Sequence, residues 1–127
     1  MKCVLITGAT GAVGSALVPV LLRDPDASAR LVLRADSGEH LQKRLDGLFT
    51  FWASDPDAPA LAGRVTAVRG DVSRPNLGLS ADDHAALVRE VTHVVHAAGD
   101  VKLNKPLAEA RASAVDSVRH AVAFARA

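Results

Sequence analysis

Three glycines spaced three residues apart directly follow the first apolar run of the chain, Lys2–Thr7. An apolar stripe with helical spacing begins right after them, so the order is strand, glycine turn, helix. Glycine lets the chain turn tightly after the strand, lets a diphosphate approach the bare backbone and lets the helix pack closely. The N–H groups at the helix start would then face the anion. A merely structural turn is the alternative. We favour a nucleotide-binding loop made of Gly8, Thr10, Gly11, Ala12, Val13 and Gly14.

The chain as a whole alternates short runs rich in Val, Leu and Ile with runs of helical periodicity. The expected strands, nearly continuously apolar as in a sheet covered on both faces, are Lys2–Thr7, Ala29–Arg34, Arg64–Arg69 and Thr92–His96. Helices are expected over Gly11–Arg23, which contains Pro19, over Gly38–Trp52, from Ser80 through Val88, and from Lys105 to the C-terminus. The alternation predicts an α/β fold of the Rossmann type, a doubly wound parallel sheet with strand order 3-2-1-4. We expect residues 1–127 to form one partial NAD(P)-binding domain of about four βα units.

Composition argues against other classes of partner. The net charge of +1 gives no broad field for nucleic acid or an anionic membrane. No apolar stretch approaches the ~18 residues of a membrane span, and the opening residues read as a strand and not as a signal peptide. Cys3 is the only cysteine, so we expect a buried structural thiol in a reducing compartment. These features together predict a cytoplasmic location.

The end of the second expected strand carries the signal for cofactor choice. NAD-binding Rossmann domains usually place Asp or Glu there to hold the ribose 2′-hydroxyl, whereas this chain has Arg34. A guanidinium suits a 2′-phosphate, and Arg44 on the next helix could join it. Solvated surface arginines are the alternative. We therefore favour NADP(H) as the cofactor, and NAD(H) stays possible because Asp36 is close by.

Two further turns follow the third and fourth expected strands. In the first, Asp71 can accept a hydrogen bond from the adenine amino group while Val72 packs on the ring, although Gly-Asp alone is only a turn. In the second, room for the cofactor's ribose and nicotinamide is left by three small residues, Ala97, Ala98 and Gly99. His96 is interpreted as a packed or hydrogen-bonded residue at a strand end rather than as a catalyst. The other histidines share no metal-ligand spacing, so no metal site is predicted.

Together, these motifs at these intervals resemble the extended short-chain dehydrogenase/reductases of the NAD-dependent epimerase/dehydratase superfamily. The resemblance is greatest to the thioester-reductase or male-sterility-like branch, which includes fatty acyl-CoA reductases. The stretches that carry it are Leu33-Arg34-Ala35, Gly70-Asp71-Val72-Ser73-Arg74-Pro75-Asn76-Leu77-Gly78-Leu79 and His96-Ala97-Ala98-Gly99-Asp100-Val101-Lys102-Leu103-Asn104. The resemblance implies that the glycine loop holds the pyrophosphate and that the two arginines hold the 2′-phosphate. It also implies a parent enzyme that reduces a thioester-bound acyl group to an aldehyde, sometimes to an alcohol, by hydride transfer from NADPH.

Two departures from the family pattern bear on catalysis. The fourth helix usually carries Asn-Val-x-Gly-Thr, whereas this chain reads Ala114-Val115-Asp116-Ser117-Val118. The family's Tyr-x-x-x-Lys pair belongs to the next βα segment, and this chain has no tyrosine. No catalytic residue is therefore assigned, and we expect a C-terminally truncated chain that is inactive alone. A non-catalytic NADP(H)-binding sensor and an NAD-dependent sugar-nucleotide epimerase/dehydratase parent are the alternatives.

The fourth expected strand also leads to a prediction about assembly. Its valines, Val91, Val94 and Val95, would normally lie beside a fifth strand. An apolar strand edge left bare tends to pair with another copy. We therefore expect self-association through this edge.

Overall fold

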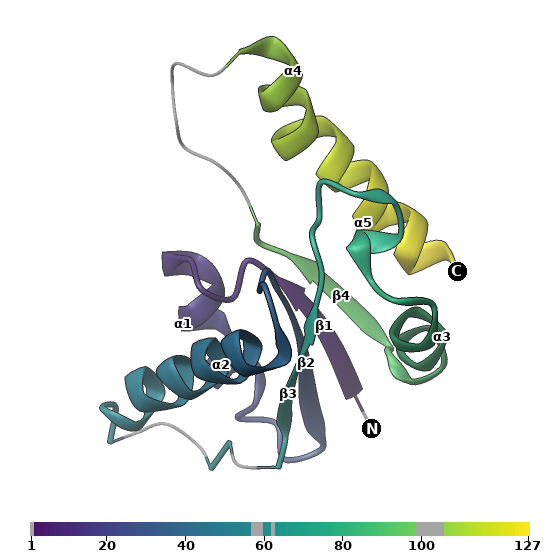
Figure 1. The fold of residues 1–127 in the computed structure, drawn as a ribbon. Coiled ribbons are helices and arrows are strands. Elements are labelled where there is room, and N and C mark those ends of the chain that lie inside the picture. Colours follow the sequence, from purple (N-terminus) through teal and green to yellow (C-terminus); the bar gives the residue numbers. More distant parts are fainter. Residues whose placement is uncertain (1, 57–59, 62, 99–105) are drawn as a thin grey trace.

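A computed structural model of the chain describes residues 2–56, 60–61, 63–98 and 106–127. Its centre is a parallel sheet made of β1 (Lys2–Thr7), β2 (Ala27–Leu33), β3 (Val65–Arg69) and β4 (His93–His96) (Figure 1). The order across the sheet is β3-β2-β1-β4, which confirms the predicted order. β1 pairs with β2 along its whole length and with β4 through Val4 to Thr7. Because the strands are parallel, their carboxyl ends meet at one edge of the sheet.

Helices cover both faces of this sheet. α1 (Ala12–Leu21) and α2 (Gly38–Ala53) lie on one face, and α3 (Ala81–Glu90) and α5 (Ser117–Arg126) lie on the other (Figure 1). Successive side chains of a strand point to opposite faces, and in β1 both sets are apolar. Val4 and Ile6 join the core cluster on the α1 and α2 side, whereas Leu5 joins the cluster on the α3 and α5 side. The doubly wound architecture is therefore confirmed.

A buried indole joins the two helices nearest the glycine loop. Trp52 of α2 is 3% exposed, and its Nε1 donates to the main-chain oxygen of Ser15 in α1 at 2.8 Å. The ring of Phe49 packs edge-on against Trp52 with ring centres 5.7 Å apart. A buried Trp N–H usually needs such a partner, so this bond holds α2 against the first turns of α1.

Four element boundaries differ from the sequence-based expectation by two residues. α3 ends at Glu90 and not at Val88, and the last helix begins at Leu107 and not at Lys105. β2 begins at Ala27 and not at Ala29, because Ala27 and the next residue pair with Lys2 and Cys3 of β1. α1 ends at Leu21 and not at Arg23, and the main-chain oxygen of Leu22 accepts instead from the Arg64 guanidinium at 2.8 Å. β2 also ends at Leu33, which leaves Arg34 just beyond the strand, at the edge where the carboxyl ends meet.

Two helical segments have a form that the sequence did not predict. The described part of the last helix begins as α4 (Leu107–Ala110), continues as a π-helical stretch, η2 (Arg111–Asp116), and only then becomes α5. A short 3₁₀ segment, η1 (Pro75–Gly78), precedes α3. Within it Asn76 and Leu77 adopt left-handed φ angles of 55° and 57°. Leu77 is fully buried in the α3 and α5 cluster, and we attribute the strained backbone to the burial of that side chain.

β4 pairs with β1 on one side and has no other strand partner among the described residues. Its valines are half-buried rather than bare, because Val95 packs on the α1 and α2 cluster and Val94 on the opposite one. Self-association through this edge stays a prediction. Within the part of the chain that the structure describes, no helix combines the length and apolar character that crossing a membrane requires.

Candidate functional site

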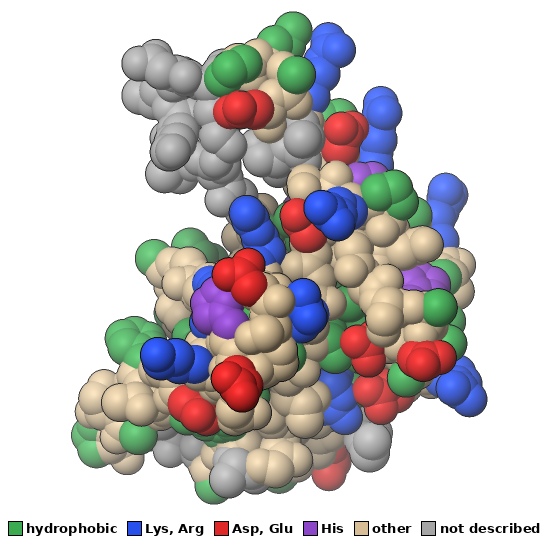
Figure 2. Space-filling model, in the orientation of Figure 1, with side chains coloured by type: hydrophobic (Ala, Val, Ile, Leu, Met, Phe, Trp, Pro, Cys, Tyr) green, Lys and Arg blue, Asp and Glu red, His purple; other side chains and the backbone are tan. Residues whose placement is uncertain are grey.

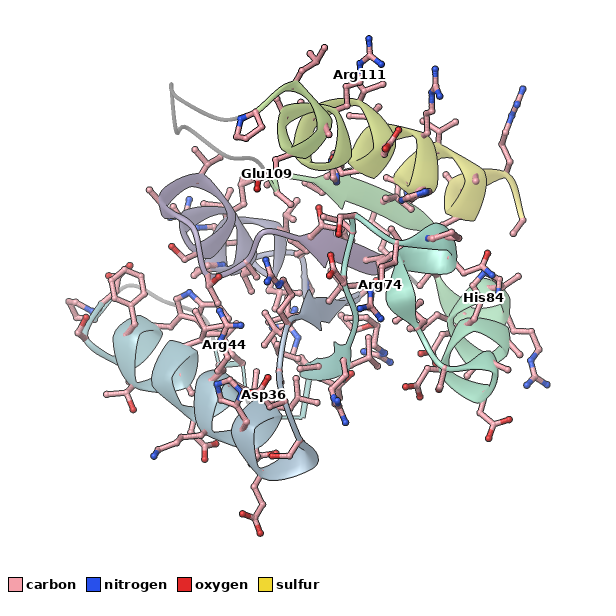
Figure 3. All side chains as sticks on the ribbon, turned by 45° about the horizontal axis from the view of Figure 1, so that its top comes forward. Asp36, Arg44, Arg74, His84, Glu109 and Arg111 are labelled. Atoms are coloured by element: carbon pink, nitrogen blue, oxygen red, sulfur yellow. The ribbon has the colours of Figure 1, made fainter. Side chains whose placement is uncertain are left out.

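A cavity of about 910 Å³ opens at the edge where the four strands end. Turns after every strand line it: Gly8 to Gly11 after β1, Arg34 to Asp36 after β2, Gly70 to Ser73 after β3, and Ala97 and Ala98 after β4. Val32 and Leu33 of β2, His40 and Arg44 of α2, and Glu109 of α4 also line it. Figure 3 shows Asp36 and Arg44 beside α2, and Glu109 on the α4 side of the same region. Ligands of open parallel α/β sheets bind at this edge.

The glycine loop forms one wall of the cavity, and two of its glycines are required by geometry. Gly8 has a φ of +76°, and a Cβ there would lie 2.4 Å from the main-chain nitrogen of Ala98. A Cβ on Gly14 would lie 2.0 Å from the main-chain oxygen of Gly8. Gly14 therefore lets helix α1 approach the backbone of the glycine loop closely. The sequence had suggested instead that this glycine lets the helix pack on the strand.

Gly11 differs from its two neighbours in the motif. Its φ is −78°, and a Cβ there would lie 3.4 Å from the main-chain oxygen of Gly8, so the fold alone tolerates a side chain. Gly11 is the N-cap of α1, and no side-chain hydrogen bond caps this helix start. Uncapped N–H groups at a helix N-terminus, facing a bare main chain, form the cradle that a diphosphate needs.

Arg44 connects the glycine loop to the end of β2. One terminal nitrogen of its guanidinium donates to the main-chain oxygen of Arg34, and the other donates to Thr10 Oγ1 at 3.3 Å. Arg34 itself is exposed at the cavity. The structure therefore brings together the two arginines that the sequence paired, and it adds Thr10 as the link between them and the glycine loop.

The turn after β3 holds a carboxylate in a fixed position. Ser73 donates to Asp71 Oδ1 through its main-chain nitrogen at 2.9 Å and through its hydroxyl at 2.6 Å. Burial raises the pKa of Asp71, but the Ser73 hydrogen bonds and the positive charges of Arg34 and Arg74 together hold the pKa below its usual value. The Asp71 side chain is therefore a charged acceptor at neutral pH, and the nearest cation to its other oxygen is Arg74 Nε at 3.9 Å.

His120 on α5 supports the same turn from outside the cavity. Its Nδ1 lies 2.9 Å from the main-chain oxygen of Val72, and because a carbonyl only accepts, that nitrogen carries the proton. The main-chain nitrogen of Asp71 donates to the oxygen of Leu77 at 2.7 Å, which closes the turn over η1. Val72 is thereby held between α5 and the buried Leu77.

His96 lies at the end of β4 and forms bonds to two other elements. Its Nδ1 is 2.7 Å from Thr7 Oγ1 at the end of β1, and its Nε2 is 3.5 Å from Ser117 Oγ at the start of α5. Thr7 Oγ1 also accepts from the main-chain nitrogen of Ala98 at 3.3 Å. His96 is not among the residues that line the cavity. Its interpretation as a hydrogen-bonded strand-end residue agrees with these contacts.

Burial lowers the pKa of His96 below its usual 6.5, so the folded chain binds this proton less readily than the unfolded chain does. The contribution of neutral His96 to stability is therefore complete above the unfolded-state pKa of 6.5. It is lost as the pH falls through the lower pKa of the folded state. We expect the unfolding free energy to decrease more steeply between about pH 7 and pH 5 in the native chain than in a His96→Gln variant. Urea unfolding at several pH values, followed by the fluorescence of Trp52, measures this difference. Parallel pH profiles for the two proteins would contradict it.

Most of the predicted site residues surround this cavity. Ala12, Val13 and Gly14 do not line it, since they lie in the first turn of α1 behind the loop. Gly99 lies outside the described residues, as do the positions from 100 to 105. Within the described part of the chain, no cluster of His, Cys, Asp or Glu is placed to hold a metal ion.

Sequence reasoning missed His40 and Glu109. His40 had a usable signal, because Ser37 is a good N-cap and would place residue 40 in the first turn of α2, beside the end of β2. Glu109 had none, since its position depends on where α4 lies relative to the carboxyl ends of the strands. Figure 2 shows basic, acidic and histidine side chains close together on the α2 side of the molecule, so the charge there is mixed.

A glycine loop between a strand and a helix, at the carboxyl edge of a parallel sheet in the order 3-2-1-4, defines a Rossmann domain that binds a dinucleotide. The sequence profile of the male sterility protein family matches residues 6–127. The chain belongs to this family, the thioester-reductase branch of the extended short-chain dehydrogenase/reductases, and it is an NAD(P)-binding module of that family. The resemblance seen in the sequence is thereby confirmed.

Two relatives and one solved structure illustrate the match. The chain is 30% identical over 129 residues to fatty acyl-CoA reductase wat of Drosophila melanogaster, covering 98% of this chain and 25% of that protein. It is 38% identical over 108 residues to isonitrile lipopeptide synthase of Mycobacterium tuberculosis, covering 80% of this chain and 4% of that protein. It superimposes on the terminal R domain of the myxalamid PKS-NRPS biosynthetic pathway with a TM-score of 0.83 and 30% identity, covering 98% of this chain and 32% of that domain. The chain thus spans a quarter or less of these two relatives and about a third of the R domain.

Proposed function

We propose that this chain is the NADP(H)-binding part of an NADPH-dependent oxidoreductase. In a full-length parent, the reaction would be reduction of an acyl thioester to an aldehyde or an alcohol by hydride transfer. The observation that carries the choice of NADP(H) is the pair Arg34 and Arg44 at the end of β2, in the same cavity as the glycine loop. The names of the relatives, a fatty acyl-CoA reductase and a terminal R domain, support the thioester substrate class.

The described residues at the cavity offer suitable groups for the pyrophosphate, the adenosine and the nicotinamide ribose of such a cofactor. The backbone of Gly8 and Gly11 and the start of α1 would hold the pyrophosphate, because no Cβ at Gly11 obstructs its approach. Arg34 and Arg44 would hold the 2′-phosphate, since a guanidinium matches phosphate geometry. Asp71 would accept a hydrogen bond from the adenine amino group while Val72 packs on the ring, and Ala97 and Ala98 would leave room for the nicotinamide ribose.

This chain supplies binding and orientation, and the bound cofactor supplies the hydride. The 127 residues contain no tyrosine, so the proton transfer that the family assigns to tyrosine has no donor here. The fixed charge of Asp71 and the bond between Arg44 and Thr10 would order the two ends of the adenosine before any chemistry occurs. We therefore expect the chain alone to bind NADPH without turning it over by that route.

Replacing Arg34 with alanine tests the assignment of the 2′-phosphate. Loss of charge-assisted hydrogen bonds should weaken NADPH binding by about 10- to 100-fold and change NADH binding by less than about threefold. Titration calorimetry with both nucleotides measures the ratio. Arg89→Ala is the matched control, because Arg89 of α3 carries the same charge and does not line the cavity. Equal losses for both nucleotides in Arg34→Ala would refute the assignment.

A further inference from the structure

His40 is fixed at the rim of the cavity by two hydrogen bonds to the turn that precedes α2. Its main-chain nitrogen donates to Ser37 Oγ at 3.1 Å, as in a capped helix start. Its ring Nδ1 accepts from the main-chain nitrogen of Asp36 at 3.0 Å. The ring lines the same cavity as Arg34 and Arg44. A side chain that is 43% exposed is thus held in one place by its own turn.

The bond to Asp36 determines which ring nitrogen carries the proton. A main-chain N–H can only donate, so Nδ1 is the acceptor and the neutral ring holds its proton on Nε2. His40 therefore offers an N–H donor at Nε2 without having to gain a charge. Its partner Asp36 contributes only its main-chain nitrogen to this bond, and the Asp36 carboxylate, fully exposed, lies 3.8 Å from Nδ1.

The hydrogen bonds of Arg44 leave only part of its guanidinium to face a ligand. One N–H of each terminal nitrogen donates inside the protein, to the main-chain oxygen of Arg34 and to the hydroxyl of Thr10, so two of the five donors of this guanidinium are used there. A phosphate presents three oxygens, each able to accept more than one hydrogen bond. The phosphate can therefore accept from a further donor at the rim besides the two arginines, and the nearby Asp36 carboxylate offers none.

We propose that His40 is a third ligand of the 2′-phosphate, donating from Nε2, and so a residue that determines the preference for phosphorylated over unphosphorylated ribose. This inference rests on the proposed function, because it specifies how that same site selects its cofactor. It differs from a structural role, in which the ring would only lock the first turn of α2. A structural role would affect every adenine nucleotide equally, whereas a phosphate ligand affects only nucleotides that carry the 2′-phosphate.

The test compares adenosine 2′,5′-bisphosphate with 5′-AMP by titration calorimetry, on the whole 127-residue chain. His40→Phe keeps a planar ring and removes the donor, and we expect about five- to twentyfold weaker binding of the bisphosphate. Binding of 5′-AMP should change by less than about twofold. His40→Gln, whose amide can both accept and donate, should recover part of the loss. An unchanged ratio in His40→Phe, or equal losses for both nucleotides, would overturn the proposal.

A measurement on the native protein covers the case in which His40→Phe fails to fold. The ¹⁵Nε2 resonance of His40 should shift when the bisphosphate is added and stay in place with 5′-AMP. No shift with the bisphosphate would overturn the role of His40 while leaving the arginine assignment intact. A native chain that binds both nucleotides equally would instead overturn the assignment of the 2′-phosphate site itself, together with this inference.

Discussion

Replacement of Gly14 by alanine is expected to lower the unfolding free energy by about 3 kcal/mol or more and to abolish dinucleotide binding. The new Cβ would lie 2.0 Å from the main-chain oxygen of Gly8 and 2.6 Å from its carbon, and neither backbone atom can move without moving the loop. Trp52 is the only tryptophan and is hydrogen-bonded to α1, so its fluorescence reports the packing of that helix during urea unfolding.

Gly11→Ala is the matched control for this prediction, because the same methyl group is added three residues earlier. Its Cβ would meet only the oxygen of Gly8, at 3.4 Å, and the φ of −78° suits alanine. We expect a change in unfolding free energy within about 1 kcal/mol, yet a loss of nucleotide affinity of at least about tenfold. A stable Gly14→Ala variant, or a Gly11→Ala variant that binds normally, would show that the loop does not work as described.

Replacement of Arg64 by alanine is expected to cost about 3 to 5 kcal/mol of stability. Its guanidinium donates to four main-chain oxygens at 2.6 to 3.2 Å, those of Leu22, Asp24, Ala27 and Ala60. The Arg64 side chain therefore links the end of α1, the start of β2 and the turn before β3 through one guanidinium. Several of these oxygens would lose their partner together in the alanine variant.

Arg64→Lys separates geometry from charge. A lysine ammonium is a compact point charge and cannot span four separate oxygens, so we expect it to recover less than about half of the lost stability. Arg89→Ala, which removes an exposed arginine from α3, should change the unfolding free energy by no more than about 0.5 kcal/mol. Full rescue by lysine would mean that charge alone, rather than the arrangement of donors, stabilises this corner of the fold.

Much of the site could be predicted because its signals are local. The spacing of Gly8, Gly11 and Gly14 identifies a loop between a strand and a helix, and the structure places it at the cavity. Arg34 follows a strand, and the helical repeat puts Arg44 one or two turns into α2. Parallel strands share one carboxyl edge, so residues that follow each strand must converge there.

The remaining features depend on contacts between distant parts of the chain. His120 reaches Val72 across 48 positions, and Arg64 reaches Leu22 across 42. The left-handed turn at Leu77 follows from burial of its side chain under α5 and α3, which no local preference of Asn-Leu indicates. The π-helical stretch before α5 is likewise absent from the apolar periodicity that predicted a single continuous helix.

Taken alone, the sequence determined the order of strands and helices, the parallel sheet and the position of the glycine loop, because each depends on residue periodicity or on the absence of a Cβ. Only the tertiary structure decided which side chains near the loop hold one another, such as Arg44 with Thr10 and His96 with Thr7. The physical reason is that a hydrogen bond needs its two atoms within about 3 Å, and no residue spacing specifies that distance until the elements have packed.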